Sequence, residues 1–581
     1  MPADLNASLA NAWLALPESL RQRLALASTG WRHLALAGAE CLRLARTADD
    51  PAEKSRLQVL AADILLWAFG ENPLSGPLAA EILSAADLPL CNAARTSLSA
   101  VATHWRAPEG KEGGLAYFER LAQRRDTRKL ADFLAGQVQK DPAGLFWREK
   151  ALALALYSGA GELAEFLEAT ALEGLSGTPG FVPASRMLRA QAAFLRGDLN
   201  ACLHELTIEL PLLQDVYGPA FAAARAGLAL LSAGEDTAAL PLLRDCLAAA
   251  PWQAGLAQVA ADAQNGLRHR LTPPPGPALI MLYSWNKSAD LDATLASLFA
   301  SDLSTKGGGR ARVMVLDNGS SDETAQVLDA WQGRAGESLL RMDLPVNIGA
   351  PAARNWLAAT PEAKAAEILV YLDDDVDLPP DWLHRLGAAL EAHPDTGVVG
   401  CRVADHQAPH LLQNVAGHLV VPPDAPEDRP DLDFQSLAPN PFRLADAHLQ
   451  GPDWGLFDFV GACGSVTGCC HLFRRAAFDA VGPFSLALGP SQYDDFERDL
   501  RMLAAGRVAV CQGHLRVRHR KRSGLAAQEG DASSNAFGNR YKMQTMHTRE
   551  EIAGFIAAQA LRLGEAVAGA FALLDRAGDP S

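Results

Sequence analysis

Hydrophobic residues follow two different spacings along this chain. Up to about residue 268, alanines and leucines recur at helical spacing and runs of β-branched residues are nearly absent. A proline-rich linker at 269–277, containing LTPPPGP, follows this region. Beyond it, short apolar runs such as ALIMLYSW and ARVMVLDNG alternate with helical stretches such as ADLDATLASLFA. The first pattern predicts an all-α domain over 1–268, and the second predicts a largely parallel, doubly wound sheet with helices on both faces.

The helical half contains a weak repeat. Gly161, Gly197 and Gly234 lie between amphipathic stretches, at intervals of 36 and 37 residues. A glycine between two helices at such a period is typical of stacked helical hairpins. The last unit, RAGLALLSAGEDTAALPLLRDCLAAAP, resembles a tetratricopeptide repeat, whereas the other two units are degenerate. The later part of this domain is therefore either tetratricopeptide-like or an irregular helical array, and the sequence favours neither.

The composition and charge of the chain exclude some classes of function. The formal net charge is −16 and RVRHRKR at 516–522 is the one long basic block, so we expect no nucleic-acid partner. The chain opens without a basic segment followed by an apolar stretch, and it contains no uninterrupted apolar run of about 18 residues. We therefore expect a cytoplasmic protein with no transmembrane segment. Nine scattered cysteines without a CxxC pair fit reduced, mostly buried thiols.

The stretch VYLDDDVDLPPDW at 370–382 carries four aspartates among five positions at the end of a predicted strand. Buried carboxylates need a positive partner, so the alternatives are a solvated turn, a calcium loop and a metal-dependent substrate site. The calcium loop fails because its required Gly and Glu are missing. If the strand continues, Asp373 and Asp375 share one face and Asp374 lies on the other. Two carboxylates on one face suit a divalent cation.

Four further motifs place polar residues after predicted strands or at the start of helices. They are VLDNGSSDET with Asp317, NIGAPAARN with Arg354, GPSQYDDFERDL with Asp494 and Asp495, and the strand-like segment that ends at His519. Each motif alone also has a plain structural interpretation: a turn with a helix cap, a surface arginine, a pair of capping acids and an ordinary histidine. Their combination is more specific than any one of them.

In this order, the motifs resemble the family 2 glycosyltransferases, which have the GT-A fold, over about 278–525. The first strand ends in YSWNK, where the family has a Thr-Tyr-Asn-like element, and Asp373 to Asp375 match its Asp-x-Asp motif. Two departures are visible, because Tyr283 replaces the usual proline and Asp494 replaces the usual, longer Glu. The predicted architecture is an all-α domain followed by an α/β GT-A domain at 278–525. A C-terminal polar segment and an amphipathic helix follow at 526–581.

The resemblance implies roles for individual residues. The residues expected to contact the nucleotide-sugar donor are Ser284, Asn286, Asp317, Arg354, Asp373 and Asp374. Asp375 and His519 are expected to bind Mn²⁺ or Mg²⁺ at the diphosphate, and Asp495 is expected to be the catalytic base. Acceptor-binding residues should lie within about 401–470, where Trp454, Phe457 and Phe459 could stack on a sugar ring.

The implied function is that of an inverting, metal-dependent glycosyltransferase. It would move a sugar from a nucleoside-diphosphate sugar to a hydroxyl of a protein or of a surface-glycan precursor, and the helical domain would bind the acceptor or a protein partner. The alternative is a helical-repeat adaptor with an inactive glycosyltransferase-like domain, and the intact Asp373, Asp375, Asp495 and His519 argue against it. A nucleotidyltransferase of related fold would need a glycine-rich phosphate loop after the first strand, which YSWNKSADL does not provide.

Overall fold

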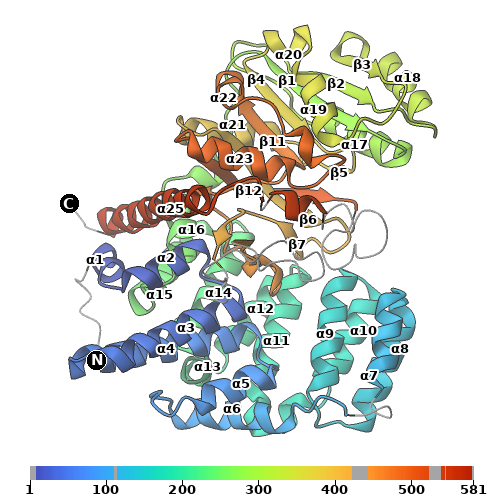
Figure 1. Ribbon diagram of the computed structural model, residues 1–581. Coiled ribbons are helices and arrows are strands. Elements are labelled where there is room, and N and C mark those ends of the chain that lie inside the picture. Colours follow the sequence, from blue (N-terminus) through green and yellow to red (C-terminus); the bar gives the residue numbers. More distant parts are fainter. Residues whose placement is uncertain (1–7, 110–113, 422–441, 522–537, 544, 579–581) are drawn as a thin grey trace.

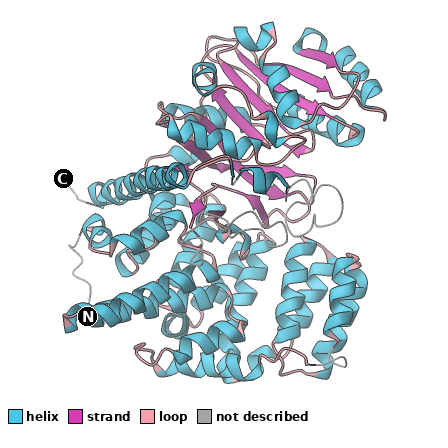
Figure 2. Cartoon of the chain, in the orientation of Figure 1, coloured by secondary structure: helices cyan, strands magenta, loops and turns pink. Residues whose placement is uncertain are grey.

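The structure is a computed structural model that describes residues 8–109, 114–421, 442–521, 538–543 and 545–578. It has a helical part and a sheet-containing part, which contact each other (Figure 1). Figure 2 shows the strands gathered in one part of the molecule, while the other part is built from helices. This arrangement confirms the predicted fold class, an all-α region followed by an α/β domain built on a sheet.

The described residues of the helical part form sixteen α-helices before the linker. They are α1 (Leu9–Leu14), α2 (Glu18–Leu26), α3 (Trp31–Thr47), α4 (Pro51–Glu71), α5 (Gly76–Ser84), α6 (Asn92–His104), α7 (Leu115–Gln123), α8 (Thr127–Lys140), α9 (Phe146–Ser158), α10 (Glu162–Leu172), α11 (Val182–Leu195), α12 (Leu199–Thr207), α13 (Leu210–Tyr217), α14 (Phe221–Ser232), α15 (Asp236–Ala249) and α16 (Ala254–Gln264). Consecutive helices pack as pairs, among them α3 with α4 and α9 with α10.

The three glycines of the weak repeat lie between paired helices. Gly197 separates α11 from α12 and Gly234 separates α14 from α15, with φ angles of 74° and 83°. This left-handed conformation ends the first helix of each pair at no steric cost to glycine. Gly161 differs, because it is the N-cap of α10 and has a φ of 134°. Because α13 lies between the second and third pair, the repeat is not uniform, and the tetratricopeptide-like description stays a prediction.

The second part is built on one mixed sheet with the strand order β10-β12-β6-β11-β4-β1-β2-β3, and β5 and β7 pair with β12 and β6. Its strands are β1 (Ala278–Ser284), β2 (Arg312–Asp317), β3 (Leu339–Asp343), β4 (Ile368–Leu372), β5 (Val376–Asp377), β6 (Val398–Asp405), β7 (Leu412–Asn414), β10 (Val460–Cys463), β11 (Cys470–Arg474) and β12 (Ala509–His519). Strands β1 to β4 are mutually parallel, whereas β11 runs antiparallel to β4 and β6. A separate pair is formed by β8 (Leu419–Val420) and β9 (Arg443–Leu444).

Helices cover both faces of this sheet. They are α17 (Ser288–Ala300), α18 (Thr324–Ala335), α19 (Ala350–Ala358), α20 (Pro361–Ala365), α21 (Trp382–Ala392), α22 (Arg475–Val481) and α23 (Asp494–Ala504). Along β1, Ile280 and Leu282 enter the core on one face, and Leu279 and Met281 enter the core on the other. A strand that is buried on both faces has a continuous run of apolar residues, which is the pattern that the sequence shows.

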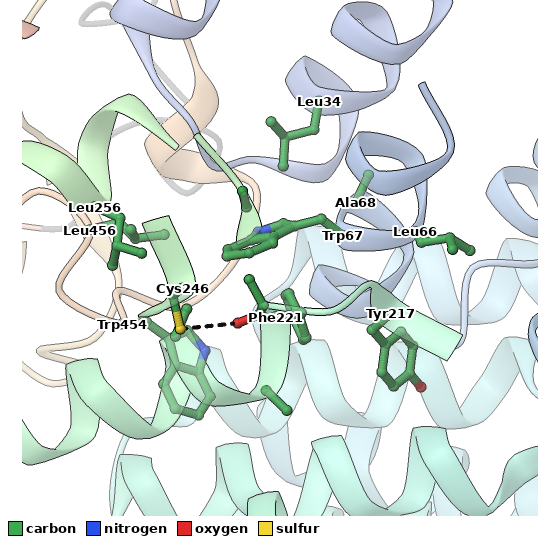
Figure 3. Packing of buried hydrophobic residues seen from close by; sticks show 14 of the residues in the cluster. Leu34, Leu66, Trp67, Ala68, Tyr217, Phe221, Cys246, Leu256, Trp454 and Leu456 are labelled. Atoms are coloured by element: carbon green, nitrogen blue, oxygen red, sulfur yellow. Dashed lines mark hydrogen bonds between the residues drawn. The ribbon is translucent and has the colours of Figure 1, made fainter. Parts of the chain in front are cut away.

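The segment before β10 joins the two parts. Trp454 stacks on Phe194 of α11, with ring centroids 4.2 Å apart, and is buried. Figure 3 shows Trp454 and Leu456 beside Leu256 and Cys246, within the core of the helical part. The expectation that Trp454 stacks on an acceptor sugar is therefore wrong, because its ring faces are used in packing. Phe459 also packs against this core.

The C-terminal helix α25 (Arg549–Gly578) returns to the start of the chain, where it contacts α1, α2 and α16. Val567, Phe571 and Leu574 are buried in the main core of the helical part. Among the described residues, Arg549–Ala577 is the one stretch that is long and apolar enough to cross a membrane, judged by length and composition alone. This candidate membrane-spanning stretch was not predicted from the sequence, because charged residues interrupt every apolar run.

Candidate active site

An ammonium group balances the aspartates that follow β4. Lys287 Nζ lies 2.9 Å from Asp374 Oδ1 and 2.8 Å from Asp375 Oδ2. Ser284, the last residue of β1, donates from Oγ to Asp374 Oδ2 at 2.7 Å. Burial raises the pKa of Asp374 to about 6, although Lys287 opposes this shift. Lys287 was not predicted to be part of the site. The sequence pattern that could have indicated it is a lysine three residues after the end of the first strand.

Strand alternation does not extend through these aspartates. β4 ends at Leu372, and the chain turns at Asp374 and Asp375. Both carboxylates therefore contact the same Lys287 ammonium. The prediction that Asp374 points away from Asp375 is wrong, because it assumed a strand that has already ended. Asp374 bonds Ser284 and Lys287.

His519, at the end of β12, faces Asp375. Its Nε2 lies 2.9 Å from Asp375 Oδ1 and 3.9 Å from Asp373 Oδ2, while Nδ1 donates to Gln413 Oε1 at 2.9 Å. Burial opposes the ionisation of both partners, but their attraction outweighs it, so the pKa of Asp375 is lowered and that of His519 is raised. Gln413, from β7, fixes the ring orientation and was not predicted.

These residues fit a divalent cation. Asp375 is almost fully buried, and its Oδ1 lies against the His519 imidazole. A buried carboxylate oxygen next to an imidazole nitrogen is a suitable pair of ligands for Mn²⁺. Asp373 contributes a third group on the more exposed side. The predicted metal ligands Asp375 and His519 are thus adjacent in the structure.

Asp495 occupies the first turn of α23. Its Oδ2 accepts from the Gly468 N–H at 2.6 Å, and its Oδ1 accepts from the Phe496 N–H at 2.8 Å. The next residue after Gly468 is also engaged, because Cys469 O accepts from the Asp373 N–H at 3.1 Å. Two consecutive residues therefore connect the predicted base to the first aspartate of the Asp-x-Asp motif. No sequence pattern predicted that Gly468 or Cys469 would lie in the site, because their position depends on how β11 pairs within the sheet.

Arg354, in α19, lies between α23 and the Asp-x-Asp motif and is close to a carboxylate of each. Its Nη1 lies 2.6 Å from Asp494 Oδ2 and its Nη2 lies 3.8 Å from Asp373 Oδ1. The guanidinium lies 5.6 Å from the Tyr283 ring centroid and is buried. Arg354 is therefore an internal cation between α23 and β4 rather than a surface arginine.

Asp317, the last residue of β2, and Asn286, in the loop after β1, both bind the turn that follows β2. Asp317 Oδ1 accepts from the Ser320 N–H at 2.9 Å, and Asn286 Oδ1 accepts from the Ser321 N–H at 2.7 Å. The loop after β1 thus fixes the turn after β2, and both loops form one edge of the site. Their predicted contacts with the donor stay a prediction, whereas their role in shaping this turn is visible.

Replacing Gly319 in this turn by Ala is expected to destabilise the protein. Its φ is +77°, and an added Cβ would lie 2.5 Å from the carbonyl carbon of Val346. The left-handed conformation alone costs a non-glycine residue at least about 1 kcal/mol, and the clash adds to this cost. Urea unfolding measures the effect. Gly333→Ala, in α18 with open space around the added Cβ, is the matched control and should stabilise by about 0.5 kcal/mol or more.

One family model and a number of solved structures are similar to this chain. Residues 280–440 match the family model described as glycosyl transferase family 2. Among solved structures, GalNAc-T7 with UDP, GalNAc and Mn²⁺ has a TM-score of 0.33 and 15% identity, covering 47% of this chain and 47% of that chain. The mannosyltransferase PcManGT from Pyrobaculum calidifontis with GDP-Man and Mn²⁺ has the same TM-score of 0.33 and 15% identity, covering 56% of this chain and 88% of that chain.

This chain thus spans about half the length of the first of these structures. No curated protein matches it. The assignment rests on the family model rather than on these distant likenesses, and it confirms the resemblance seen in the motifs. This chain contains a glycosyl transferase family 2 domain over residues 280–440.

Proposed function

We propose that this protein is an inverting, metal-dependent glycosyltransferase. It transfers a sugar from a nucleoside-diphosphate sugar to a hydroxyl of a protein or of a surface-glycan precursor. We place the reaction in the cytoplasm, because all nine cysteines are unpaired, as is usual in a reducing compartment. The family match over 280–440 and the proximity of a base to the metal-binding aspartates support this proposal.

One observation carries the proposal. The Gly468 N–H binds Asp495, and the Cys469 carbonyl binds the Asp373 N–H, so adjacent residues fix a base beside a metal-binding carboxylate. Transfer of a sugar needs these two groups at the two ends of one reaction: a base for the incoming hydroxyl and positive charge for the departing diphosphate. A domain that only bound a partner would not need this alignment.

The reaction follows from the positions of the side chains. Asp495 accepts the proton of the acceptor hydroxyl while the hydroxyl oxygen bonds to the anomeric carbon. The bond between this carbon and the diphosphate oxygen breaks on the opposite side, so a single displacement inverts the configuration. Two backbone N–H groups orient the Asp495 carboxylate for this task. Arg354 balances the negative charge of Asp494 and Asp373 nearby.

Asp373, Asp375 and His519 are the residues that would hold the cation. When bound, Mn²⁺ or Mg²⁺ would neutralise charge on the diphosphate as it leaves. Lys287 contributes a fixed positive charge at the same place, because its ammonium contacts Asp374 and Asp375.

The helical part is a candidate acceptor site. A cavity of about 340 Å³ lies between α9, α10, α11 and residues 408–410. These residues follow β6, whose last residue, Asp405, is in register with His519. An acceptor in this cavity would therefore lie on a segment that leads directly to the metal-binding histidine. This continuity supports the proposal that the helical part binds the acceptor or a protein partner.

Thermal unfolding with Mn²⁺ and a panel of nucleotide-sugars tests the function. A cation at about 100 times its Kd should stabilise the protein by about 2.7 kcal/mol, seen as an increase in Tm of a few degrees. Asp375→Ala should lose this increase, because the variant lacks a buried ligand. Asp381→Ala, in the same stretch but paired with Arg385, is the control and should keep it.

The same panel identifies the donor, since the correct nucleotide-sugar should raise Tm further and be consumed with a suitable acceptor. Equal shifts in wild type and Asp375→Ala would overturn the metal assignment. If no donor is bound, hydrolysed or transferred, the result would favour an adaptor with an inactive domain.

A further inference from the structure

Three potential metal ligands of different chemistry meet beside Asp375. Asp373, Cys469 and His519 each direct one ligand atom to a common place, and these oxygen, sulfur and nitrogen atoms all lie within 4.8 Å of one another. Metal–ligand bonds of about 2.0–2.3 Å in a tetrahedral site hold the ligand atoms about 3.3–3.8 Å apart. The three atoms would therefore contact one cation after moving closer to one another by up to about 1 Å.

The three groups are held in place by separate elements. Cys469 precedes β11 and is buried, and its carbonyl accepts from the Asp373 N–H at 3.1 Å. His519 is held by Gln413 on its other ring nitrogen at 2.9 Å. Cys469 is thus a buried residue of the sheet's hydrophobic core whose sulfur lies next to the ligand atoms of Asp373 and His519.

A second feature points to a ligand at the same place. The Oδ1 atom of the buried Asp375 lies 2.9 Å from His519 Nε2. A cation bound by both atoms would replace the imidazole proton as the positive partner of this buried carboxylate. With Asp373, Cys469 and His519, it completes a set of four possible ligands.

We propose that Cys469 is a ligand of the divalent cation, so that this site binds a cation that accepts sulfur, such as Zn²⁺ or Co²⁺, more tightly than Mg²⁺. This inference rests on the proposed function for the presence of a cation here. On binding, the S–H bond of Cys469 breaks, its proton passes to solvent, and the sulfur lone pair bonds to the cation without any change of oxidation state. Mg²⁺ prefers oxygen ligands, whereas thiolate and imidazole together suit Zn²⁺ and Co²⁺.

Absorption spectroscopy with Co²⁺ and Cd²⁺ tests the sulfur ligand directly, because a metal-bound thiolate gives a charge-transfer band. Cys91 is the one exposed cysteine, so the experiment uses a Cys91→Ser background; a serine can still cap α6. The band should appear in this background and be lost in Cys469→Ser. Cys470→Ser is the matched control and should keep it. Calorimetry should show that Cys469→Ser weakens Co²⁺ binding by about 10-fold or more, while Mg²⁺ binding changes little.

The outcomes separate this inference from the proposed function. Co²⁺ binding with no charge-transfer band would overturn the role of Cys469 and leave the metal-dependent transferase intact. Absence of both cation binding and Mn²⁺-dependent transfer would overturn both. Circular dichroism of Cys469→Ser checks its fold, and Cys469→Ala gives an independent variant in which the band should also be lost.

Discussion

Replacing Asp495 by Asn is expected to lower the rate of sugar transfer by about 10²- to 10⁴-fold, the usual contribution of a general base. The substitution keeps the shape of the side chain and one oxygen that can accept from the Gly468 N–H, while the amide nitrogen replaces the acceptor of the Phe496 N–H. It removes the group that takes the proton of the acceptor hydroxyl. The loss should therefore appear in kcat, whereas the KM for the donor and the increase in Tm caused by Mn²⁺ should change little.

Steady-state kinetics with the donor found in the thermal panel measures this effect. Asp479→Asn is the matched control, because the same change is made at an exposed carboxylate that pairs, within the described part of the chain, with Arg475 of its own helix. Its activity should equal that of the wild type. An Asp495→Asn enzyme that kept more than about one-tenth of the activity would show that another group acts as the base.

The order of elements in the second half could be predicted because local patterns determine it. Apolar runs such as ALIMLYSW become strands buried on both faces, and the polar residues that follow them gather at one edge of the sheet. For this reason Ser284, Asp373, Asp375 and His519 could be located from the sequence.

The remainder of the site depends on contacts between distant segments. Gly468, Cys469 and Gln413 reach it only because β11 and β7 pair with β4 and β6, and no local spacing encodes these antiparallel pairings. The predicted orientation of Asp374 was wrong because side chains alternate between the two faces only inside a strand. β4 ends at Leu372, directly before Asp373. The burial of Trp454 likewise depends on Phe194 of the helical part, which is remote in sequence.

Arg225→Met is expected to lower the free energy of unfolding by about 3–5 kcal/mol, because it leaves one charge of a buried ion pair without its partner. Arg225 Nη2 lies 3.1 Å from Glu71 Oε1, and both side chains are more than nine-tenths buried. The guanidinium also lies 5.1 Å from the ring centroids of both Phe221 and Trp454. This arginine therefore joins α4 and α14 to the segment before β10, and its loss weakens the contact between the two parts.

The loss of unfolding free energy in Arg225→Met should depend on pH. Burial already raises the pKa of Glu71, and Arg225 opposes that shift, so removing Arg225 raises the pKa further. A carboxyl whose pKa is higher in the folded state favours folding while it is protonated, and this contribution is lost as the pH rises through the folded-state pKa. Urea unfolding should thus give a smaller deficit at about pH 5 than at about pH 8. Adding Glu71→Gln to Arg225→Met should recover part of the loss and remove the pH dependence, because Gln carries no charge. Its one oxygen can accept from the Gly30 N–H, and its amide nitrogen can donate to Thr29 Oγ1. If the single and double variants unfold alike at both pH values, the loss comes from packing on Trp454 rather than from the unpaired charge.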